Sequence, residues 1–304
     1  MKNLLKKSAL GIAVVSVCAA ASAGPVILGG DDLTDHGSRS AGGVNLNGWL
    51  YIEKAVANVL SGVTRAGVIT TDIVALGSIA NPSFSSSNAG GAIGSAANVL
   101  GKTVTYVDGA ANINTFFAAL AAGSINPGML WMAGTDASNN LDAAEGLALT
   151  ANAAAINSFG ASGGGIMAHG SGVSAYGWLS ALLPGISEVG NCNATGATLT
   201  AAGIAAFPGL SNGNISSGPC HSSFIGNFGG LQTLGLDGAG RSFIIGGGAG
   251  TIIQCGQPGQ PPCPPAGVPE PGSLPLVVLA AMGLALPQFR RLRNRKAGAS
   301  KTAD

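Results

Sequence analysis

The chain has 304 residues, of which 46% are hydrophobic, 9% are charged and 50 are glycines. Its formal net charge of +1 is unevenly distributed, because the body from Gly24 to Val268 holds five basic and eleven acidic residues, a net −6. This excludes nucleic acid as an expected partner, since no basic patch is present to neutralise phosphates. A body of about 245 residues is long enough for one domain with a hydrophobic core.

Residues 1–23 have the pattern of a secretory signal peptide. Three lysines precede an apolar stretch at 9–20, and the small residues Ala-Ser-Ala at 21–23 form a cleavage site. We therefore expect the mature protein to begin at Gly24 and to be exported.

The first half of the body alternates between expected strands and helices. A short buried strand at 25–30 precedes a polar loop at 31–37, and a helix at 48–60 follows with Glu53 and Lys54 on its wet side. Next come a strand at 67–76, a serine- and glycine-rich loop at 81–91, a helix at 92–100, a strand at 103–107, a helix at 113–122 and a strand at 128–133. Such alternation favours an α/β fold, a single domain with a mostly parallel sheet flanked by helices.

The second half opens with the longest expected helix, from 140 to about 159. Asp142 and Glu145 near its start fit a capping box and are expected to be structural. The remaining expected elements are a strand, sharp turn and helix within 162–183, an irregular or antiparallel cap at 191–240, and a last strand at 241–245. We expect domain boundaries at 1–23, 24–253, 254–267, 268–296 and 297–304, the third segment being a proline-rich, extended spacer.

Four cysteines remain after removal of the signal peptide, an even number in a chain bound for an oxidising compartment. Three pairings are possible, and we expect Cys192 with Cys220 and Cys255 with Cys263, because sequence neighbours are the easiest to join. A zinc site is not favoured, since the spacings are irregular.

The chain from 268 onward has the features of a signal that targets a protein to the membrane. Its 17-residue apolar segment at 273–289 just spans a hydrocarbon core of about 30 Å. The basic residues after this segment should stay on the cytoplasmic side, which places the body outside. The residues of the expected signal are Val268, Pro269, Glu270, Pro271, Arg290, Arg291 and Arg293.

This order of Pro-Glu-Pro, short apolar helix and arginine cluster resembles the PEP-CTERM sorting signal of Gram-negative bacteria. Tails of this kind are also catalogued as an ice-binding protein C-terminal domain, on many unrelated bodies. The resemblance implies two partners, the inner membrane and an exosortase-type processing enzyme. It further implies transient anchoring, then release to the cell surface or the exopolysaccharide matrix. The alternative is an ordinary single-span tail anchor.

Three polar groups follow expected strands, at the edge where ligands bind in open α/β sheets. They are Asp31, Asp32, Asp35 and His36 after the first strand, Asp136 after the strand at 128–133, and His169 with Ser171 after the strand at 163–168. They are expected to share a crevice. Capping of helices and turns is the alternative role.

The segment 163–172 is similar to the strand-to-helix elbow of class I glutamine amidotransferase-like proteins, especially the trehalose-utilisation-type branch. No cysteine stands at this elbow, so thiolate-dependent glutaminase chemistry is not expected. Ser171 lacks the Gly-x-Ser-x-Gly spacing of serine hydrolases. Its base would be His36, His169 or His221, with Asp31, Asp32 or Asp35 as the orienting acid, and spacing selects none of them.

The acids Asp31, Asp32 and Asp35 with His36 also form a candidate calcium or magnesium site, although their spacing matches no known loop. No other cofactor is expected.

Three functions compete. The first is an exported surface or matrix protein whose body is non-catalytic or has a cryptic activity. The second is a secreted hydrolase of carbohydrates or amides that uses His169 with the acids Asp31, Asp32 and Asp35, and Ser171 and Asp136 are further candidate catalytic residues. The third is an ice-binding or structural repeat surface, which the lack of a fixed sequence period does not favour.

Overall fold

The computed structural model describes residues 23–85, 88–134, 141–170, 175–193, 195–216 and 220–247. All of them belong to one compact unit. The expected signal peptide up to residue 22, the sorting signal, Asp136, Ser171, Cys255 and Cys263 lie outside these ranges. Within the ranges, no helix combines the length and the apolar character needed to span a bilayer.

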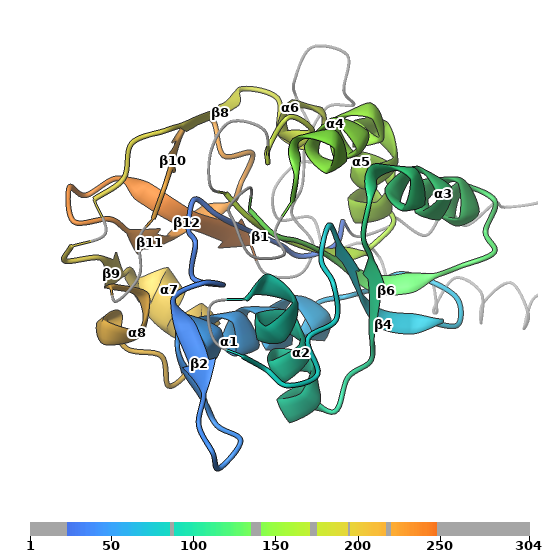
Figure 1. The fold of residues 1–304 in the computed structure, drawn as a ribbon. Helices are drawn as coiled ribbons and strands as arrows, with labels where there is room; N and C mark the ends of the chain where they lie inside the picture. The colour runs from blue at the N-terminus through green and yellow to red at the C-terminus, as the bar shows by residue number, and fades with distance from the viewer. Residues whose placement is uncertain are drawn as a thin grey trace, which may run out of the picture. The chain divides into compact units, whose positions relative to one another are not determined.

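The body is built on an eight-stranded sheet with the order β5-β4-β6-β7-β1-β12-β11-β9 (Figure 1). The parallel part consists of β5 (Val104–Val107), β4 (Thr71–Leu76), β6 (Pro127–Met132), β7 (Gly165–His169) and β1 (Val26–Gly29). An antiparallel extension follows, made of β12 (Ser242–Gly247), β11 (Gln232–Leu236) and β9 (Thr198–Leu199). The predicted α/β class with a mostly parallel, helix-flanked sheet is therefore confirmed.

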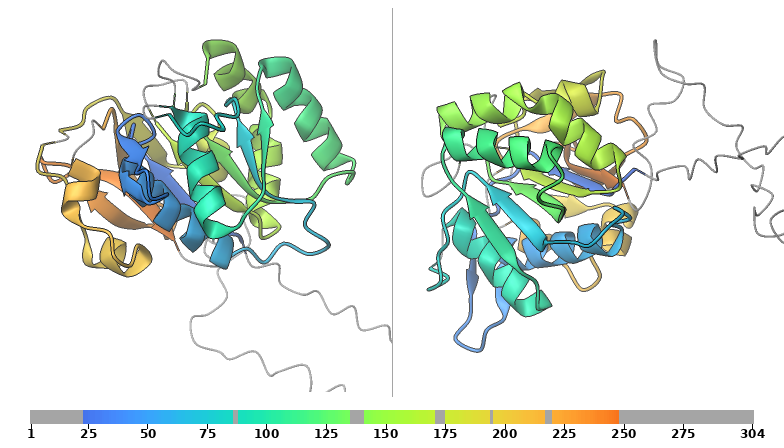
Figure 2. Two further views of the ribbon diagram at one scale, coloured as in Figure 1. Left: turned by 60° about the horizontal axis from the view of Figure 1, so that its bottom comes forward. Right: turned by 90° about the vertical axis from the view of Figure 1, so that its right-hand side faces the viewer.

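Helices cover both faces of the sheet (Figures 1 and 2). One face carries α1 (Gly48–Ser61), α2 (Ala89–Leu100), α7 (Ala201–Ala206) and α8 (Asn212–Ser216). The other carries α3 (Ala110–Ala121), α4 (Ala143–Ala151), α5 (Ala153–Ala161) and α6 (Leu179–Leu182). Two hydrophobic clusters result, one on each face.

The strand β1 shows why the sequence folds this way. Its residues Val26 and Leu28 enter the cluster beneath α3 to α6, whereas Ile27 between them enters the cluster beneath α1 and α2. Successive strand side chains point to opposite faces, so a strand covered on both sides reads as an uninterrupted apolar run.

Two small antiparallel sheets complete the body. The hairpin of β2 (Gly37–Arg39) and β3 (Asn45–Asn47) precedes α1 and was not expected from the sequence. The strands β8 (Ile186–Val189) and β10 (Ser223–Gly226) pair, and of the two β10 lies within the cap predicted at 191–240.

The expected single helix from 140 to about 159 is wrong, because two helices meet at Asn152. The Asn152 amide donates to the carbonyl oxygen of Ala148 at 2.8 Å. Such local side-chain bonds compete with helix continuation. The capping box at the start of α4 is confirmed, since Asp142 accepts from the Glu145 N–H at 2.7 Å and Glu145 accepts from the Asp142 N–H at 2.8 Å.

The expected solvent exposure of Glu53 is also wrong. Glu53 is only 7% exposed, because β3 covers this side of α1 and the Asn45 amide donates to the Glu53 carboxylate at 3.0 Å. The segment 31–37 is mostly a polar loop, as expected, and two of its acids, Asp31 and Asp32, are buried. Both acids are held by histidines.

Candidate functional site

The candidate site lies at the carboxyl ends of β1 and β7. These strands are parallel neighbours in which Gly29 pairs with His169, so the chain that leaves β1 passes directly beside this histidine. The His169 Nδ1 lies 2.8 Å from Asp31 Oδ1, and both side chains are fully buried. Polar residues that are 138 positions apart therefore meet, as expected for two strand ends at one edge of a parallel sheet.

The second nitrogen of His169 is also engaged. Trp131 Nε1, from β6, lies 3.2 Å from His169 Nε2. An indole N–H can only donate, so Nε2 is the acceptor and Nδ1 carries the proton that is donated to Asp31. The contacts thus fix the orientation of the ring, and both ring nitrogens are engaged by side chains of the protein itself.

Tyr51, from α1, packs its ring edge-on against His169 at a centroid distance of 6.3 Å. Within the described chain, the Tyr51 hydroxyl and Asp31 Oδ2 are buried without a hydrogen-bond partner. Burial, and then the charge of Asp31, raise the pKa of Tyr51 well above its ordinary value. Tyr51 therefore stays protonated at neutral pH and cannot serve as a base there.

Tyr176 lies at the carboxyl ends of β1 and β7, on the opposite face of the sheet from Tyr51. Its hydroxyl lies 2.7 Å from the carbonyl oxygen of Gly29 and 2.9 Å from that of Ala168. Burial raises the pKa of Tyr176, and the nearby charges of Glu188 and Asp31 raise it further. The inner half of the site is thus a buried polar centre.

The outer half of the site is built on Asp32. His221 Nε2 lies 3.2 Å and His36 Nε2 lies 3.5 Å from the same Asp32 oxygen, Oδ2. The Asp32 side chain is 5% exposed, whereas each imidazole is 36% exposed. All three histidines of the chain therefore contact the neighbouring acids Asp31 and Asp32. We call these five residues the histidine–aspartate cluster.

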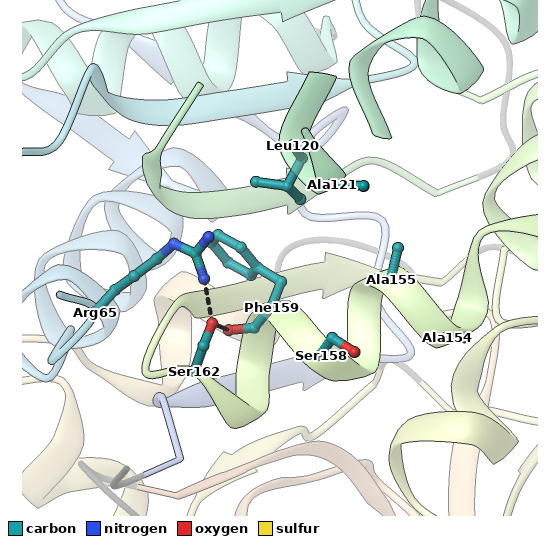
Figure 3. Close-up of a pocket in the computed structure, with 8 residues that line it drawn as sticks. All are labelled: Arg65, Leu120, Ala121, Ala154, Ala155, Ser158, Phe159 and Ser162. Carbon is teal, nitrogen blue, oxygen red and sulfur yellow. Dashed lines mark hydrogen bonds between the residues drawn. The ribbon is translucent and has the colours of Figure 1, made fainter. Parts of the chain in front are cut away.

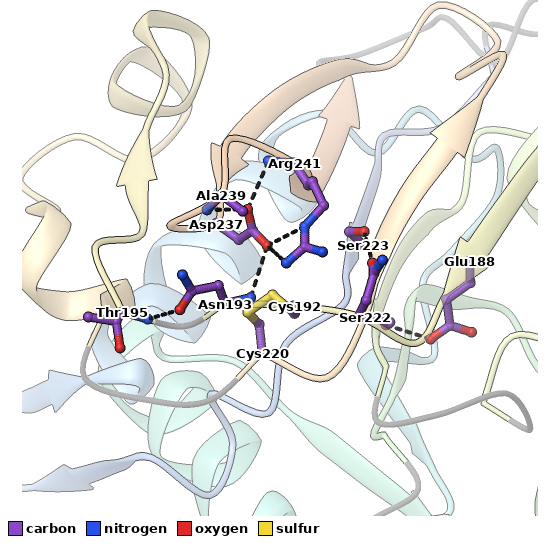
Figure 4. Close-up of a disulfide and its surroundings, with 11 residues drawn as sticks. Glu188, Cys192, Asn193, Thr195, Cys220, Ser222, Ser223, Asp237, Ala239 and Arg241 are labelled. Carbon is purple, nitrogen blue, oxygen red and sulfur yellow. Dashed lines mark hydrogen bonds and ion pairs between the residues drawn. A yellow bond between two sulfur atoms is a disulfide. The ribbon is translucent and has the colours of Figure 1, made fainter.

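A disulfide between Cys192 and Cys220 positions His221 (Figure 4). Its Cα atoms are 5.5 Å apart, and the predicted pairing of these two cysteines is confirmed. Cys220 forms an isolated antiparallel bridge with Asp31, and the N–H groups of His221 and Ser222 donate to the carbonyl oxygen of Gly30 at 2.8 and 3.0 Å. Backbone hydrogen bonds thus hold the segment 220–222 alongside the end of β1, and the disulfide joins the same segment to Cys192.

The four residues of the predicted calcium or magnesium site lie in different settings. Asp31 points inward to His169, whereas Asp32 pairs with His36 and His221. Across the described ranges, no group of three or more His, Cys, Asp or Glu residues is arranged to hold a metal ion.

A pocket of about 210 Å³ next to the cluster is lined by Tyr176, Ile186 and Glu188, among others. The Glu188 carboxylate accepts a hydrogen bond from the Ser222 hydroxyl at 2.6 Å. Burial raises the pKa of Glu188, and the bond from Ser222 offsets part of this rise. Pockets for drug-sized ligands measure about 300–1,000 Å³, so this one accommodates only a small group.

Among the predicted catalytic residues, His169 is placed and Ser171 and Asp136 lie outside the described ranges. Trp131, Tyr51 and Tyr176 were not singled out in the sequence, although all three build the inner half of the site. Comparisons of the chain with protein-family models, with curated proteins and with solved structures found no match.

Proposed function

We propose that this chain is an exported protein, displayed at the cell surface or released into the extracellular matrix, whose body is a stable non-catalytic α/β domain. The observation that carries the proposal is the Cys192–Cys220 disulfide. Structural disulfides form and persist outside the reducing cytoplasm. Export to an oxidising compartment is therefore what this body requires.

The sequence at both ends supports the same route. A signal-peptide pattern at 1–23 directs the chain to the export machinery, and the resemblance of 268–296 to a PEP-CTERM signal implies an exosortase-type enzyme as processing partner. Exopolysaccharide is the matrix partner that this resemblance implies.

The inner half of the site supports a non-catalytic body. A general base must reach the proton that it abstracts. His169 is fully buried, and Asp31 and Trp131 occupy both of its nitrogens. In this proposal His169, within the segment that resembles an amidotransferase elbow, has a structural role. Its contacts join β7 to β6 and to the end of β1.

The sorting step is tested by replacing Pro269, Glu270 and Pro271 together by alanine in a Gram-negative host that carries an exosortase. We expect this variant to stay in the membrane fraction while the unaltered chain reaches the surface or the medium. Replacement of Pro261 and Pro262 in the spacer is the matched control and should not change the distribution. Release of both variants alike would contradict sorting through this segment.

A second candidate function is hydrolysis by the outer half of the cluster. The observation that favours it is the pair of half-exposed imidazoles of His36 and His221 on one buried carboxylate, Asp32, after a parallel strand. A carboxylate that orients a histidine is the arrangement of a general base. Turnover of glycoside, ester or amide substrates that is lost in His221→Ala or His36→Ala would establish this function, and absence of turnover in the unaltered protein would exclude it for those substrates.

A further inference from the structure

A separate pocket is lined by residues from the segments that precede β4, β6 and β7 in the chain (Figure 3). Its volume is about 460 Å³, within the range of about 300–1,000 Å³ typical of small-molecule sites. The lining residues are Arg65, Leu120, Ala121, Ala154, Ala155, Ser158, Phe159 and Ser162. One arginine thus faces a wall that is otherwise apolar or carries only hydroxyl groups.

Neutral groups hold the Arg65 side chain in one orientation. Its Nε donates to Asn126 Oδ1 at 2.5 Å, Nη1 donates to the Ser162 hydroxyl, and the guanidinium carbon lies 4.8 Å from the centre of the Phe159 ring. The two polar partners are themselves fixed, since Ser162 donates to the carbonyl oxygen of Phe159 at 2.8 Å and Asn126 donates to that of Ala66 at 3.0 Å.

The charge of Arg65 has no counterion in the described chain. Lys54, Lys102 and Arg241 each pair with a carboxylate, at 2.9, 3.5 and 2.7 Å, whereas Arg39, like Arg65, contacts an amide and an aromatic ring. Arg65 makes only the neutral contacts above, and burial lowers its pKa. A guanidinium has five N–H donors, of which two are used here. The others remain for an acceptor that enters the pocket.

We propose that this pocket binds a small organic acid with an aliphatic body. The carboxylate would accept hydrogen bonds from the free donors of Arg65, whose planar fork matches a carboxylate. The aliphatic part would lie against Leu120, Ala121 and Ala155. The opposite charge and the apolar wall favour this class over a cation or a sugar.

Arg65 also lies near the carboxyl end of α5, where a cation stabilises the helix dipole. A purely structural arginine would serve that purpose without a ligand. If Arg65 is a ligand-binding residue, the pocket binds a carboxylate and loses it when Arg65 is replaced. If Arg65 is only structural, neither is expected.

The test is calorimetric titration of the full-length protein with octanoate, 1-octanol and octylamine. We expect octanoate to bind, octanol to bind at least tenfold more weakly, and octylamine not to bind. Arg65→Met should weaken octanoate binding at least tenfold. Arg39→Met is the matched control, because Arg39 likewise contacts an amide, that of Asn98, and a ring, that of Phe84, outside this pocket. The affinity of the Arg39→Met variant for octanoate should stay within twofold of that of the unaltered protein.

A second variant keeps the proposal testable if Arg65→Met does not fold. Ser158 is exposed on the pocket wall, so Ser158→Trp fills the space without disturbing the core. This variant should abolish octanoate binding and leave the melting temperature unchanged. No binding of octanoate by the unaltered protein, equal binding of octanol, or full binding by Arg65→Met or Ser158→Trp would each overturn the proposal.

Discussion

Asp31 and Cys220 face each other across an isolated antiparallel bridge. The residues that follow them, Asp32 and His221, are 189 positions apart in the sequence and are also in contact. One half of the disulfide therefore lies beside the buried acid that holds His169. The neighbours of this pair, Asp32 and His221, form the outer contact of the cluster. The covalent link and the polar cluster are thus parts of one structural unit.

Reduction of the disulfide is expected to loosen the outer half of the cluster and leave the inner half intact. The cysteines are 28 residues apart, and loss of such a link costs about 2–4 kcal/mol of stability. Denaturant unfolding with and without reductant measures this cost. In histidine NMR spectra, the His221 resonance should move on reduction and the His169 resonance should not. A shift of His169 as large as that of His221 would contradict the division into two halves.

His169 is expected to matter for stability far more than His221. Replacing His169 by alanine removes the side-chain hydrogen-bond donor to the buried Asp31 carboxylate, which should cost about 3 kcal/mol or more. His221→Ala removes a half-exposed contact and should cost about 1 kcal/mol or less. Urea unfolding of the two variants provides the comparison. Equal losses would show that His169 is not the structural centre proposed here.

The two buried tyrosines should respond in opposite ways to removal of their hydroxyl groups. Tyr51→Phe removes a hydroxyl without a partner in the described chain, so the free energy of unfolding should stay within about 1 kcal/mol or rise. Tyr176→Phe removes the contact to the carbonyl oxygens of Gly29 and Ala168 and should cost about 1–3 kcal/mol. A large loss for Tyr51→Phe would contradict the finding that the Tyr51 hydroxyl has no hydrogen-bond partner in the described chain.

Asp237 is expected to make the stability of the protein depend on pH, through its contacts next to the disulfide (Figure 4). Burial raises the pKa of Asp237, but bonds from the N–H groups of Asn193, Ala239 and Arg241 and from the Arg241 guanidinium outweigh it, so the folded pKa is lowered. The carboxylate therefore stabilises the fold above its unfolded pKa of about 3.9, and this contribution disappears as the pH falls through the folded value.

Asp237→Asn should consequently lower the free energy of unfolding at pH 7 by about 1–3 kcal/mol, the usual worth of hydrogen bonds to a charged group. The difference between the variant and the unaltered protein should shrink below about pH 4. Denaturation curves at pH 7 and pH 3 check both values. A difference that is constant across this range would exclude the charge as its source.

The sequence predicted the features that depend on local pattern. The parallel sheet followed from alternating apolar segments, the capping box from Asp142 and Glu145, and one disulfide from the proximity of Cys192 and Cys220. The approach of Asp31 to His169 followed from the rule that polar groups gather at the carboxyl ends of parallel strands.

Features that depend on distant contacts were not predictable. Glu53 lies between apolar residues of α1 and reads as a solvent-facing charge, but Asn45 of β3 covers it. Three histidines were equal candidates as a base, because nothing local shows that Trp131 occupies one nitrogen of His169 or that a disulfide carries His221 to Asp32. The segment around Asn152 has the composition of a helix interior, so the break was not visible in the sequence. In the structure the Asn152 amide donates to a backbone carbonyl oxygen of α4, where the helix ends.

Mass spectrometry of the intact product recovered from the cell surface or medium tests the central claim of export most directly. The account predicts an N-terminus at Gly24 and a peptide pair joined through Cys192 and Cys220 that separates only on reduction. Recovery of the chain only from the cytoplasm, with Met1 to Ala23 retained and both cysteines as free thiols, would contradict it.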